Sequence, residues 1–345
     1  MFLAKSRKSD IYMKLIIPMA GMGKRMRPHT LTVPKPLLPV AGKPIVHWLI
    51  EDIAAVCDQP IDEIAFVIGD FGPETEAHLL QIAESVGAKG RICYQDEPLG
   101  TAHAILCAKE SLQGEVIVAF ADTLFRAQFH LDTNPDGVIW VHKVENPSSF
   151  GVVKLDTENY ITDFVEKPAE FVSDLAIIGI YYFKSGETLH KELQYLIDND
   201  IREKGEYQLT NALENMKNKG MRFKPGTVEE WWDCGNKDAT VNTNKRLLDT
   251  RRELFHVAPE RFNGGTQIIQ PCFIGENVDL KGCTVGPYVS IGNNTKLENC
   301  VVSNSIIQNN SHIRNLNFTN SMIGNHVTLN GESCELSIGD YSTQS

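Results

Sequence analysis

Two glycines and a run of basic residues stand close to the amino terminus. The segment reads Gly21-Met22-Gly23-Lys24-Arg25-Met26-Arg27-Pro28 and follows an apolar run. Glycine leaves room for an anion to approach backbone N–H groups, and basic side chains add charge-assisted hydrogen bonds to phosphate. We therefore expect a polyphosphate site here, although an ordinary turn between a strand and a helix would also use such glycines.

The same segment departs from two common phosphate-binding patterns. A dinucleotide-binding fingerprint would place a third glycine where Met26 stands, and a Walker loop would need Gly-Lys-Ser or Gly-Lys-Thr. A second basic position follows at Lys35, between Pro34 and Pro36. Because proline fixes its own φ angle, this frame favours a lysine held in a preset direction.

Alternating apolar runs and helical periods must position these residues. We expect strands over 14–18, 64–68, 115–120 and 137–141, and helices over 45–56 and 102–112, with a further helical spacer over 238–255. This alternation is typical of a largely parallel α/β sheet.

A six-residue repeat replaces this pattern after about residue 255. Apolar residues recur six apart in four runs, which are Ile268, Ile274 and Leu280; Val285, Ile291 and Leu297; Ile307 and Ile313; and Ile323 and Leu329. One apolar residue in every six, with Gly and Asn nearby, favours a parallel β-helix in which each short strand buries one side chain. An irregular β-sandwich is the alternative.

Composition narrows the function classes. The chain has 345 residues, of which 42% are hydrophobic and 22% charged, which is enough for two domains, and its formal net charge is −11. We therefore expect no nucleic-acid partner and, since no apolar run is long enough to span a bilayer, no membrane partner. The first twelve residues lack a signal peptide's apolar run, and the eight cysteines form no C-x-x-C pair, so we expect a cytoplasmic protein with reduced thiols.

The glycine-basic segment and the following Pro-Lys-Pro-Leu-Leu-Pro-Val-Ala-Gly-Lys-Pro together resemble the opening signature of the sugar nucleotidyltransferases. The repeat resembles the tail of the long glucose-1-phosphate thymidylyltransferase-type members. The resemblance implies a Rossmann-like, mostly parallel mixed sheet flanked by helices, followed by a left-handed parallel β-helix. It places an N-terminal extension at 1–12, the nucleotidyltransferase domain at 13–253 and the β-helix at 254–345, through which we expect a homo-oligomer to form.

This family joins a nucleoside triphosphate to a sugar-1-phosphate and releases pyrophosphate with Mg²⁺. Such a displacement between polyanions needs cations and aligned atoms rather than a covalent nucleophile. Asp122 and Asp233 resemble the two magnesium-binding aspartates, although each alone could be a turn or cap residue. Arg25 and Lys35 are expected to bind the triphosphate and stabilise charge at the α-phosphorus, and Lys167 to bind the sugar phosphate.

The resemblance also implies the two substrate pockets. The expected nucleotide-binding residues are Ala20, Gly21, Gly23, Gln95, Gly100 and Thr101. Gln95 can both donate to and accept from a pyrimidine edge. His103 is expected to be a helix residue without a catalytic task. The expected sugar-phosphate-binding residues are Gly151, Glu166, Lys167, Gly179, Lys204 and Glu206.

Some positions depart from the family pattern. Ala121-Asp122-Thr123 stands where many thymidylyltransferases have Gly-Asp-Asn, and Lys204-Gly205-Glu206 where they have Arg-Gly-Glu. Ile177 and Asp233 stand where acetylhexosamine uridylyltransferases tend to have asparagine. The first two departures leave the identity of the sugar open. Ile177 and Asp233 favour thymidylyl or uridylyl transfer to glucose-1-phosphate and leave open an amino sugar or a muramic-acid derivative.

Two other functions compete with this interpretation. A catalytically silent regulatory paralogue would share the fold, but it should have lost a metal aspartate or a phosphate cation. An additional acyl transfer would need a general-base histidine within the repeat, where only His312 and His326 stand. The sequence favours an assembly role for the repeat and leaves open the sugar, the choice of dTTP or UTP, the oligomeric state and feedback regulation.

Overall fold

The structure is a computed structural model that describes residues 13–21, 23–127, 130–258, 261–262, 265–331 and 337–343. The expected N-terminal extension, 1–12, lies outside the described residues. The chain divides into two compact units by its contacts. The first comprises Met1–Gly21 and Leu49–Trp231, and the second comprises Met22–Trp48 and Trp232–Ser345.

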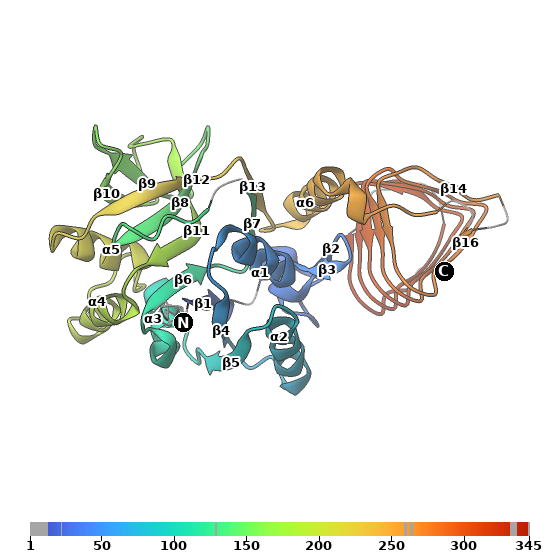
Figure 1. Cartoon of the computed structure of the whole chain (residues 1–345). Coiled ribbons are helices and arrows are strands. Elements are labelled where there is room, and N and C mark those ends of the chain that lie inside the picture. Colours follow the sequence, from blue (N-terminus) through green and yellow to red (C-terminus); the bar gives the residue numbers. More distant parts are fainter. Residues whose placement is uncertain are drawn as a thin grey trace, which may run out of the picture. The chain divides into compact units, whose positions relative to one another are not determined.

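A mixed sheet forms the first unit (Figure 1). Its strands are β1 (Met13–Pro18), β4 (Ile61–Ile68), β5 (Lys89–Tyr94), β6 (Glu115–Ala119), β8 (Gly137–Lys143), β9 (Gly151–Leu155), β10 (Ile161–Glu166), β11 (Leu175–Phe183) and β12 (Phe223–Thr227). Their order is β10-β9-β11-β6-β1-β4-β5, and β8 pairs with both β11 and β12. Pairing is parallel from β6 through β1 and β4 to β5, and antiparallel around β11. The expected Rossmann-like mixed sheet is confirmed.

Five helices of the described residues accompany the strands of this sheet, and three of them contribute to its central apolar cluster. They are α1 (Ile45–Val56), whose first residues belong to the second unit, α2 (Pro73–Ser85), α3 (Thr101–Cys107), α4 (Gly186–Asp198) and α5 (Leu209–Asn218). Side chains of α3, α4 and α5 pack with those of the central strands in one apolar cluster. Ser185 caps α4, since its hydroxyl accepts a hydrogen bond from the Thr188 N–H at 3.2 Å.

The expected elements of this unit agree with the structure except at one helix end. The strands over 14–18, 64–68, 115–120 and 137–141 correspond to β1, β4, β6 and β8, and α1 has the expected bounds. The helix expected over 102–112 instead ends at Cys107, because the Ala108 N–H bonds the Ile105 carbonyl in a tighter turn. A 3₁₀ turn, η3 (Lys109–Ser111), then follows.

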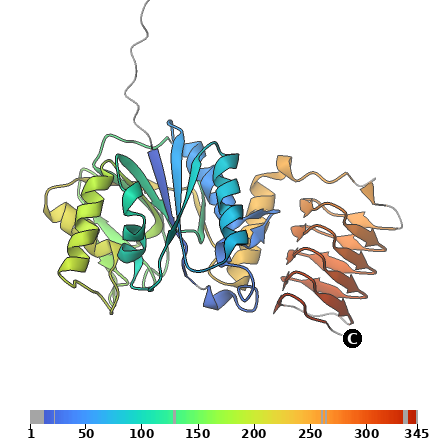
Figure 2. The ribbon, with the colours of Figure 1, turned by 90° about the horizontal axis from the view of Figure 1, so that it is seen from below.

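Parallel coils of short strands form the carboxyl-terminal part of the second unit (Figure 2). One sheet contains β14 (Gln267–Ile268), β17 (Thr284–Val285), β20 (Val301–Ser303) and β23 (Asn317–Thr319). A second contains β15 (Cys272–Ile274), β18 (Val289–Ile291), β21 (Ser305–Ile307), β24 (Met322–Ile323) and β26 (Ser337–Ile338). The third contains β16 (Asp279–Lys281), β19 (Lys296–Glu298), β22 (His312–Arg314) and β25 (Thr328–Asn330).

Apolar residues that are six positions apart lie in successive sheets of this set. Ile268, Ile274 and Leu280 lie in three different sheets, and Leu280 is directly aligned with Leu297 of the following coil. All strand pairs here are parallel among the described residues, so the expected left-handed β-helix is confirmed and the β-sandwich is wrong. Asparagines turn the corners in the left-handed backbone region, as at Asn294 (φ 57°) and Asn310 (φ 58°).

The second unit also contains the glycine-basic segment and the helical spacer. The segment contains the 3₁₀ turns η1 (Lys24–Met26) and η2 (Lys35–Leu37) and the short strands β2 (Pro39–Val40) and β3 (Lys43–Pro44). The spacer is α6 (Lys237–Thr250), followed by the 3₁₀ turn η4 (Arg252–Leu254). Two short strands outside the sheets above are β7 (Thr123–Arg126) and β13 (Glu230–Asp233). None of the helices in the described residues is long and apolar enough to cross a membrane.

Candidate active site

The expected base-binding residues lie together after β5, in the first unit. The Gln95 N–H bonds the Ile68 carbonyl at 2.8 Å, which fixes Gln95 beyond the carboxyl end of β4. Its side-chain amide lies 3.3 Å from the Gly100 carbonyl and 3.1 Å from Nδ1 of His103. His103 is a residue of α3, as expected, and it also holds the amide of Gln95, a contact that the sequence pattern does not reveal.

Gly100 is required by close packing at the start of α3. Its φ is +113°, and a Cβ here would lie 2.6 Å from the Tyr207 carbonyl oxygen. The Ala102 N–H bonds this same carbonyl at 2.9 Å. The neighbouring Thr101 hydroxyl accepts from the Leu209 N–H at 2.9 Å, at the first residue of α5. The expected nucleotide-binding residues 95–101 are therefore hydrogen-bonded to residues 207–209, which follow Glu206 directly.

Asp122 lies in the turn that follows β6, beside a bulge in β11. The Phe120 N–H bonds the Gly179 carbonyl at 2.9 Å, and Gly179 has a φ of +85°. Thr123 is buried and donates its hydroxyl to the Ile178 carbonyl at 2.8 Å. This bond gives a structural reason for threonine at the position where the family resemblance led us to expect asparagine. The structure therefore brings Asp122 and Gly179 together at one end of β6.

The expected sugar-phosphate residues meet on β9 and β10. Gly151 is aligned with Glu166, and a Cβ at Gly151 would lie 3.2 Å from the Glu166 Oε2. Lys167 forms an ion pair with Glu166 at 3.3 Å, and its N–H bonds the Phe150 carbonyl at 3.1 Å. Lys204 reaches the same turn, where Nζ lies 3.5 Å from the Lys167 carbonyl. A carboxylate and two lysines therefore lie close to Gly151.

Further residues of this region were missed by the sequence patterns. The Thr210 hydroxyl lies 3.4 Å from the Glu166 Oε2, and Gln208 donates to the Glu206 carboxylate at 3.0 Å. Both belong to the run that carries Glu206, which is the signal that could have found them. Tyr181 is buried, and burial followed by the negative charge of Glu166 raises its pKa, so the phenol stays protonated.

Gly23 and Lys35 are packed against each other in the second unit. Gly23 has a φ of +55°, and a Cβ would lie 2.9 Å from the Lys35 Cβ. The Thr30 hydroxyl donates to the Gly23 carbonyl at 2.8 Å. Lys35 is the first residue of η2 and is only 8% exposed. Arg25 is exposed in η1, so its guanidinium can reach a ligand.

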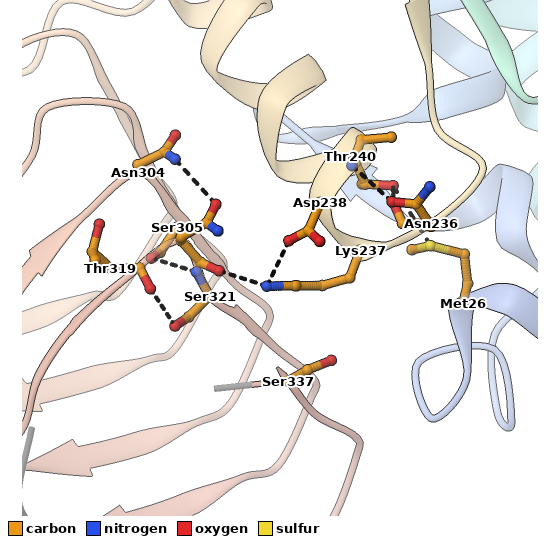
Figure 3. Close-up of polar contacts among 12 residues, drawn as sticks. Met26, Asn236, Lys237, Asp238, Thr240, Asn304, Ser305, Thr319, Ser321 and Ser337 are labelled. Carbon is orange, nitrogen blue, oxygen red and sulfur yellow. Dashed lines mark hydrogen bonds and ion pairs between the residues drawn. The ribbon is translucent and has the colours of Figure 1, made fainter. Parts of the chain in front are cut away.

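Asp233 ends β13 in the second unit. Its backbone carbonyl accepts from the Thr243 hydroxyl of α6 at 2.8 Å. A Cβ at Gly235 would lie 2.8 Å from the Asp233 Oδ2, so glycine leaves space for this carboxylate. The element that follows, α6, contacts the glycine-basic segment through the Thr240 hydroxyl, which lies 3.6 Å from Sδ of Met26 (Figure 3).

The carboxylates of the described residues suit a metal that takes few protein ligands. No group of three or more His, Cys, Asp or Glu side chains that could hold a metal ion occurs among them. Zinc cages need four such ligands, whereas Mg²⁺ commonly takes one or two carboxylates and completes its shell with water and phosphate oxygens. Asp122 and Asp233 each carry the carboxylate oxygens that a hard divalent metal takes together with phosphate oxygens.

Comparisons with known proteins identify the family and the fold. Residues 14–250 match the family described as nucleotidyl transferase. The low-salt glycan biosynthesis nucleotidyltransferase Agl11 of Haloferax volcanii is 29% identical over 87% of this chain and 89% of its own. A glucose-1-phosphate thymidylyltransferase of Streptomyces antibioticus is 27% identical over 92% of this chain and 93% of its own. A crystal structure of UDP-glucose pyrophosphorylase complexed with UDP-glucose has the same fold, with a TM-score of 0.58 and 22% identity over 70% of this chain and all of that one.

Proposed function

The chain belongs to the nucleotidyl transferase family and is a sugar-1-phosphate nucleotidyltransferase, and we propose that its substrates are dTTP or UTP and glucose-1-phosphate. A phosphate oxygen of the sugar-1-phosphate attacks the α-phosphorus of the triphosphate. The new P–O bond forms as the bond to the β-phosphate breaks, so the products are a nucleotide-sugar and pyrophosphate.

The convergence of Glu166, Lys167 and Lys204 beside Gly151 carries the sugar-phosphate part of this proposal. Lys167 and Lys204 offset the negative charge of the attacking phosphate. Glu166, whose side chain is 13% exposed, accepts hydrogen bonds from sugar hydroxyls. We also assign Gly179 and Glu206 to the sugar pocket, because they stand at positions that the family resemblance gives to sugar binding. Carbohydrate recognition needs few but well-positioned polar groups, which this arrangement supplies.

We assign residues with small or fixed side chains to the binding of the nucleotide. Ala20, Gly21 and Gly23 let backbone N–H groups approach the triphosphate, and Arg25 and Lys35 stabilise charge at the α-phosphorus. Gln95 hydrogen-bonds the base, with Gly100 and Thr101 beside it. Its amide contacts the Gly100 carbonyl and His103, so its orientation is set before the base binds.

We propose Asp122 and Asp233 as the ligands of the divalent metal, a pair that follows from the family signature, and Mg²⁺ as that metal. Bound there, the ion would neutralise phosphate charge and orient the triphosphate for in-line displacement. Backbone hydrogen bonds of the chain hold the two aspartates in place. Asp122 is fixed by the backbone bond between Phe120 and Gly179, and Asp233 by the bond that Thr243 donates to its carbonyl.

An alternative acceptor is the 1-phosphate of an amino sugar or of a muramic-acid derivative, with UTP as the donor. Ile177 bears on this choice, because its Cδ1 would lie 3.3 Å from a Cβ at Gly151 and so borders the proposed sugar pocket. An apolar side chain here gives no hydrogen bond to an acetamido group, which favours glucose. A catalytically silent regulatory paralogue is the other alternative.

The experiment is pyrophosphate release with Mg²⁺, measured for five nucleoside triphosphates against a panel of sugar-1-phosphates. We expect release with dTTP or UTP and glucose-1-phosphate. Release only with UTP and an amino-sugar phosphate would transfer the assignment to the alternative acceptor. A folded protein that releases no pyrophosphate with any pair would overturn the proposed activity in favour of the silent paralogue.

Three further properties of the chain are also proposals, which are its division into domains, its self-association and its cellular location. We propose a nucleotidyltransferase domain at 13–253 and a β-helix domain at 254–345 through which copies of the chain associate. Val301 and Ile269 are apolar positions exposed on the β-helix, at 50% and 38%, and support such an association. The cysteines among the described residues are free thiols, which supports a cytoplasmic location.

A further inference from the structure

An asparagine ladder runs along one corner of the β-helix. The side-chain oxygens of Asn293, Asn309 and Asn325 each accept from a backbone N–H of the preceding coil, at 2.8, 2.7 and 3.0 Å. Asp340 takes the next position, and its Oδ1 accepts from the Asn325 N–H at 2.5 Å. The ladder therefore changes from an amide to a carboxylate at its last described step.

This change supplies an acceptor to the glycine-basic segment. The second carboxylate oxygen of Asp340 accepts a hydrogen bond from the hydroxyl of Thr32. An asparagine would offer an N–H₂ donor or a single oxygen here, whereas aspartate accepts on both sides at once. Nearby, Nε2 of His29 lies 3.2 Å from the Ser337 hydroxyl. Two residues that follow Arg25 are thus bonded to the last coil.

A glycine near this corner shows that the segment takes the place of a further coil. A Cβ at Gly292 would lie 2.5 Å from the Asn309 Oδ1, and one at Gly324 would lie 2.5 Å from the Asp340 Oδ1, so these glycines face the next coil. At the corresponding Gly339, a Cβ would instead lie 2.9 Å from the Cβ of Pro28. Pro28 therefore covers the last coil where another coil would otherwise stack.

The covering segment is itself compact. Thr30 holds the Gly23 carbonyl, Gly23 packs on Lys35, and Met26 contacts Thr240 of α6. The amino-terminal end of α6 is tied to the β-helix as well, since Lys237 donates to the Asn320 carbonyl at 3.0 Å and pairs with Asp238 at 2.8 Å (Figure 3). A cavity of about 350 Å³ lies between 28–32 and 337–342. The contact between these two segments therefore depends on the packing of Pro28 and on the hydrogen bonds of His29 and Thr32.

We propose that the last β-helix coil positions the triphosphate-binding segment, with Thr32, Ser337 and Asp340 as positioning residues for nucleotidyl transfer. This inference rests on the proposed role of Arg25 and Lys35. The coil restricts the segment to the conformation that binds the triphosphate, and the segment in turn packs on the coil at Gly339. Because such coupling is reciprocal, nucleotide binding also stabilises the coil.

Two sets of substitutions remove the contact from different sides. Thr32→Val with Ser337→Ala deletes both hydroxyls, and Gly339→Ala places a methyl group against Pro28. The matched control is Ser303→Ala with Thr319→Val, which deletes a hydroxyl pair, 2.9 Å apart, between two other coils. Thr32→Val alone leaves the β-helix sequence unchanged, and Thr32→Ser restores the hydroxyl.

Steady-state kinetics with the triphosphate that supports pyrophosphate release in the wild type give the first readout. We expect the double variant and Gly339→Ala to raise KM for the triphosphate about tenfold, with kcat and the KM for the sugar-1-phosphate nearly unchanged. Thr32→Ser should restore the wild-type value. Equal KM values in these variants and in the control pair would overturn the proposal while leaving the enzymatic activity established.

Hydrogen exchange gives the second readout, which does not depend on turnover. Without nucleotide, amides of 23–37 should exchange about tenfold faster in the double variant than in the control pair. With dTTP or UTP and Mg²⁺, amides of 337–343 should become protected in the wild type and not in Gly339→Ala. Unchanged exchange of 23–37 in both variant sets would refute the positioning role even if the protein had no activity.

Discussion

At the scale of single residues, the site depends on charges that local backbone structure fixes in place. Asp122 is the sharpest case, because a turn between β6 and β7 and the bulge at Gly179 hold it while its carboxylate contributes the proposed metal ligand. Replacing the carboxylate by an amide removes a charge and keeps the volume. The effect on the fold should therefore be small and the effect on the metal site large.

We expect Asp122→Asn to lower kcat/KM for pyrophosphate release by about 100-fold or more. Its thermal transition should stay close to that of the wild type. Asp198→Asn, at an exposed position of α4, is the control and should leave the rate unchanged. Mg²⁺-dependent turnover at the wild-type rate in Asp122→Asn would show that this aspartate is not a metal ligand.

His29 gives a pH dependence to the stability of the second unit. The side chain is 2% exposed, and burial lowers its pKa to about 4 against an opposing effect of Asp340. Above pH 6.5 the histidine is neutral in both the folded and unfolded chains, so its contribution is complete. Between pH 6.5 and about 4 the unfolded chain binds the proton first, and the free energy of unfolding falls by up to about 3 kcal/mol.

Urea unfolding at a series of pH values measures this loss. His29→Gln keeps a polar group of similar reach but cannot titrate, so its free energy of unfolding should decline less steeply over the same pH range. Parallel pH curves for the wild type and the variant would mean that His29 does not set this dependence.

At the scale of elements, the contact between the starts of α3 and α5 connects the proposed nucleotide-binding and sugar-binding residues of the first unit. Gly100 combines a φ of +113° with a backbone contact to Tyr207 that leaves no room for a side chain. Gly87 also has a positive φ, of +81°, but a Cβ there would meet nothing within 4 Å. Gly87 therefore measures the cost of a positive φ alone, whereas Gly100 adds a clash with Tyr207 and a ψ of 178° that side chains rarely adopt at positive φ.

We expect Gly100→Ala to lower the free energy of unfolding by about 3 kcal/mol or more, and Gly87→Ala by about 1 kcal/mol. Chemical denaturation of both variants gives the comparison. The Gly100 variant should also lose affinity for the triphosphate, because Thr101 and the Gln95 amide share the displaced turn. Equal destabilisation by the two substitutions would show that Tyr207 yields to the added methyl group.

Elements with a strong periodic pattern could be predicted from the sequence. The apolar period of 45–56 gave the correct bounds of α1, and six-residue spacing was enough to predict the β-helix, because each coil repeats the same burial. The end of α3 could not be placed, since its 3₁₀ continuation depends on a local hydrogen bond that no residue type signals.

The same distinction applies to the candidate site. Gly151, Glu166 and Lys167 were found by motif, and the structure brings them together. The contact between Pro28 and Gly339 could not be predicted, because it joins positions more than 300 residues apart. No residue pattern in the sequence marks either position as a partner of the other. The structural tasks of Thr123 and His103 likewise depend on neighbours that only the fold supplies.

At the scale of the whole molecule, the proposed association through the β-helix can be measured directly. Sedimentation of the full chain should show an oligomer, and Val301→Glu, which adds a charge at a half-exposed apolar position, should shift the equilibrium towards the monomer. Thr284→Glu, on the neighbouring strand of the same sheet, tests whether the effect is confined to Val301. A wild-type chain that is monomeric at all concentrations would contradict the assembly.

The central claim is that the chain moves a nucleotidyl group onto a sugar-1-phosphate, and labelled triphosphate tests it most directly. The measurement follows the fate of dTTP or UTP labelled at the α- or the γ-phosphorus, incubated with Mg²⁺ and glucose-1-phosphate. We expect the α-label in the nucleotide-sugar and the γ-label in pyrophosphate, in equal amounts. Release of the γ-label as inorganic phosphate, or an α-label that remains in free nucleotide, would contradict it.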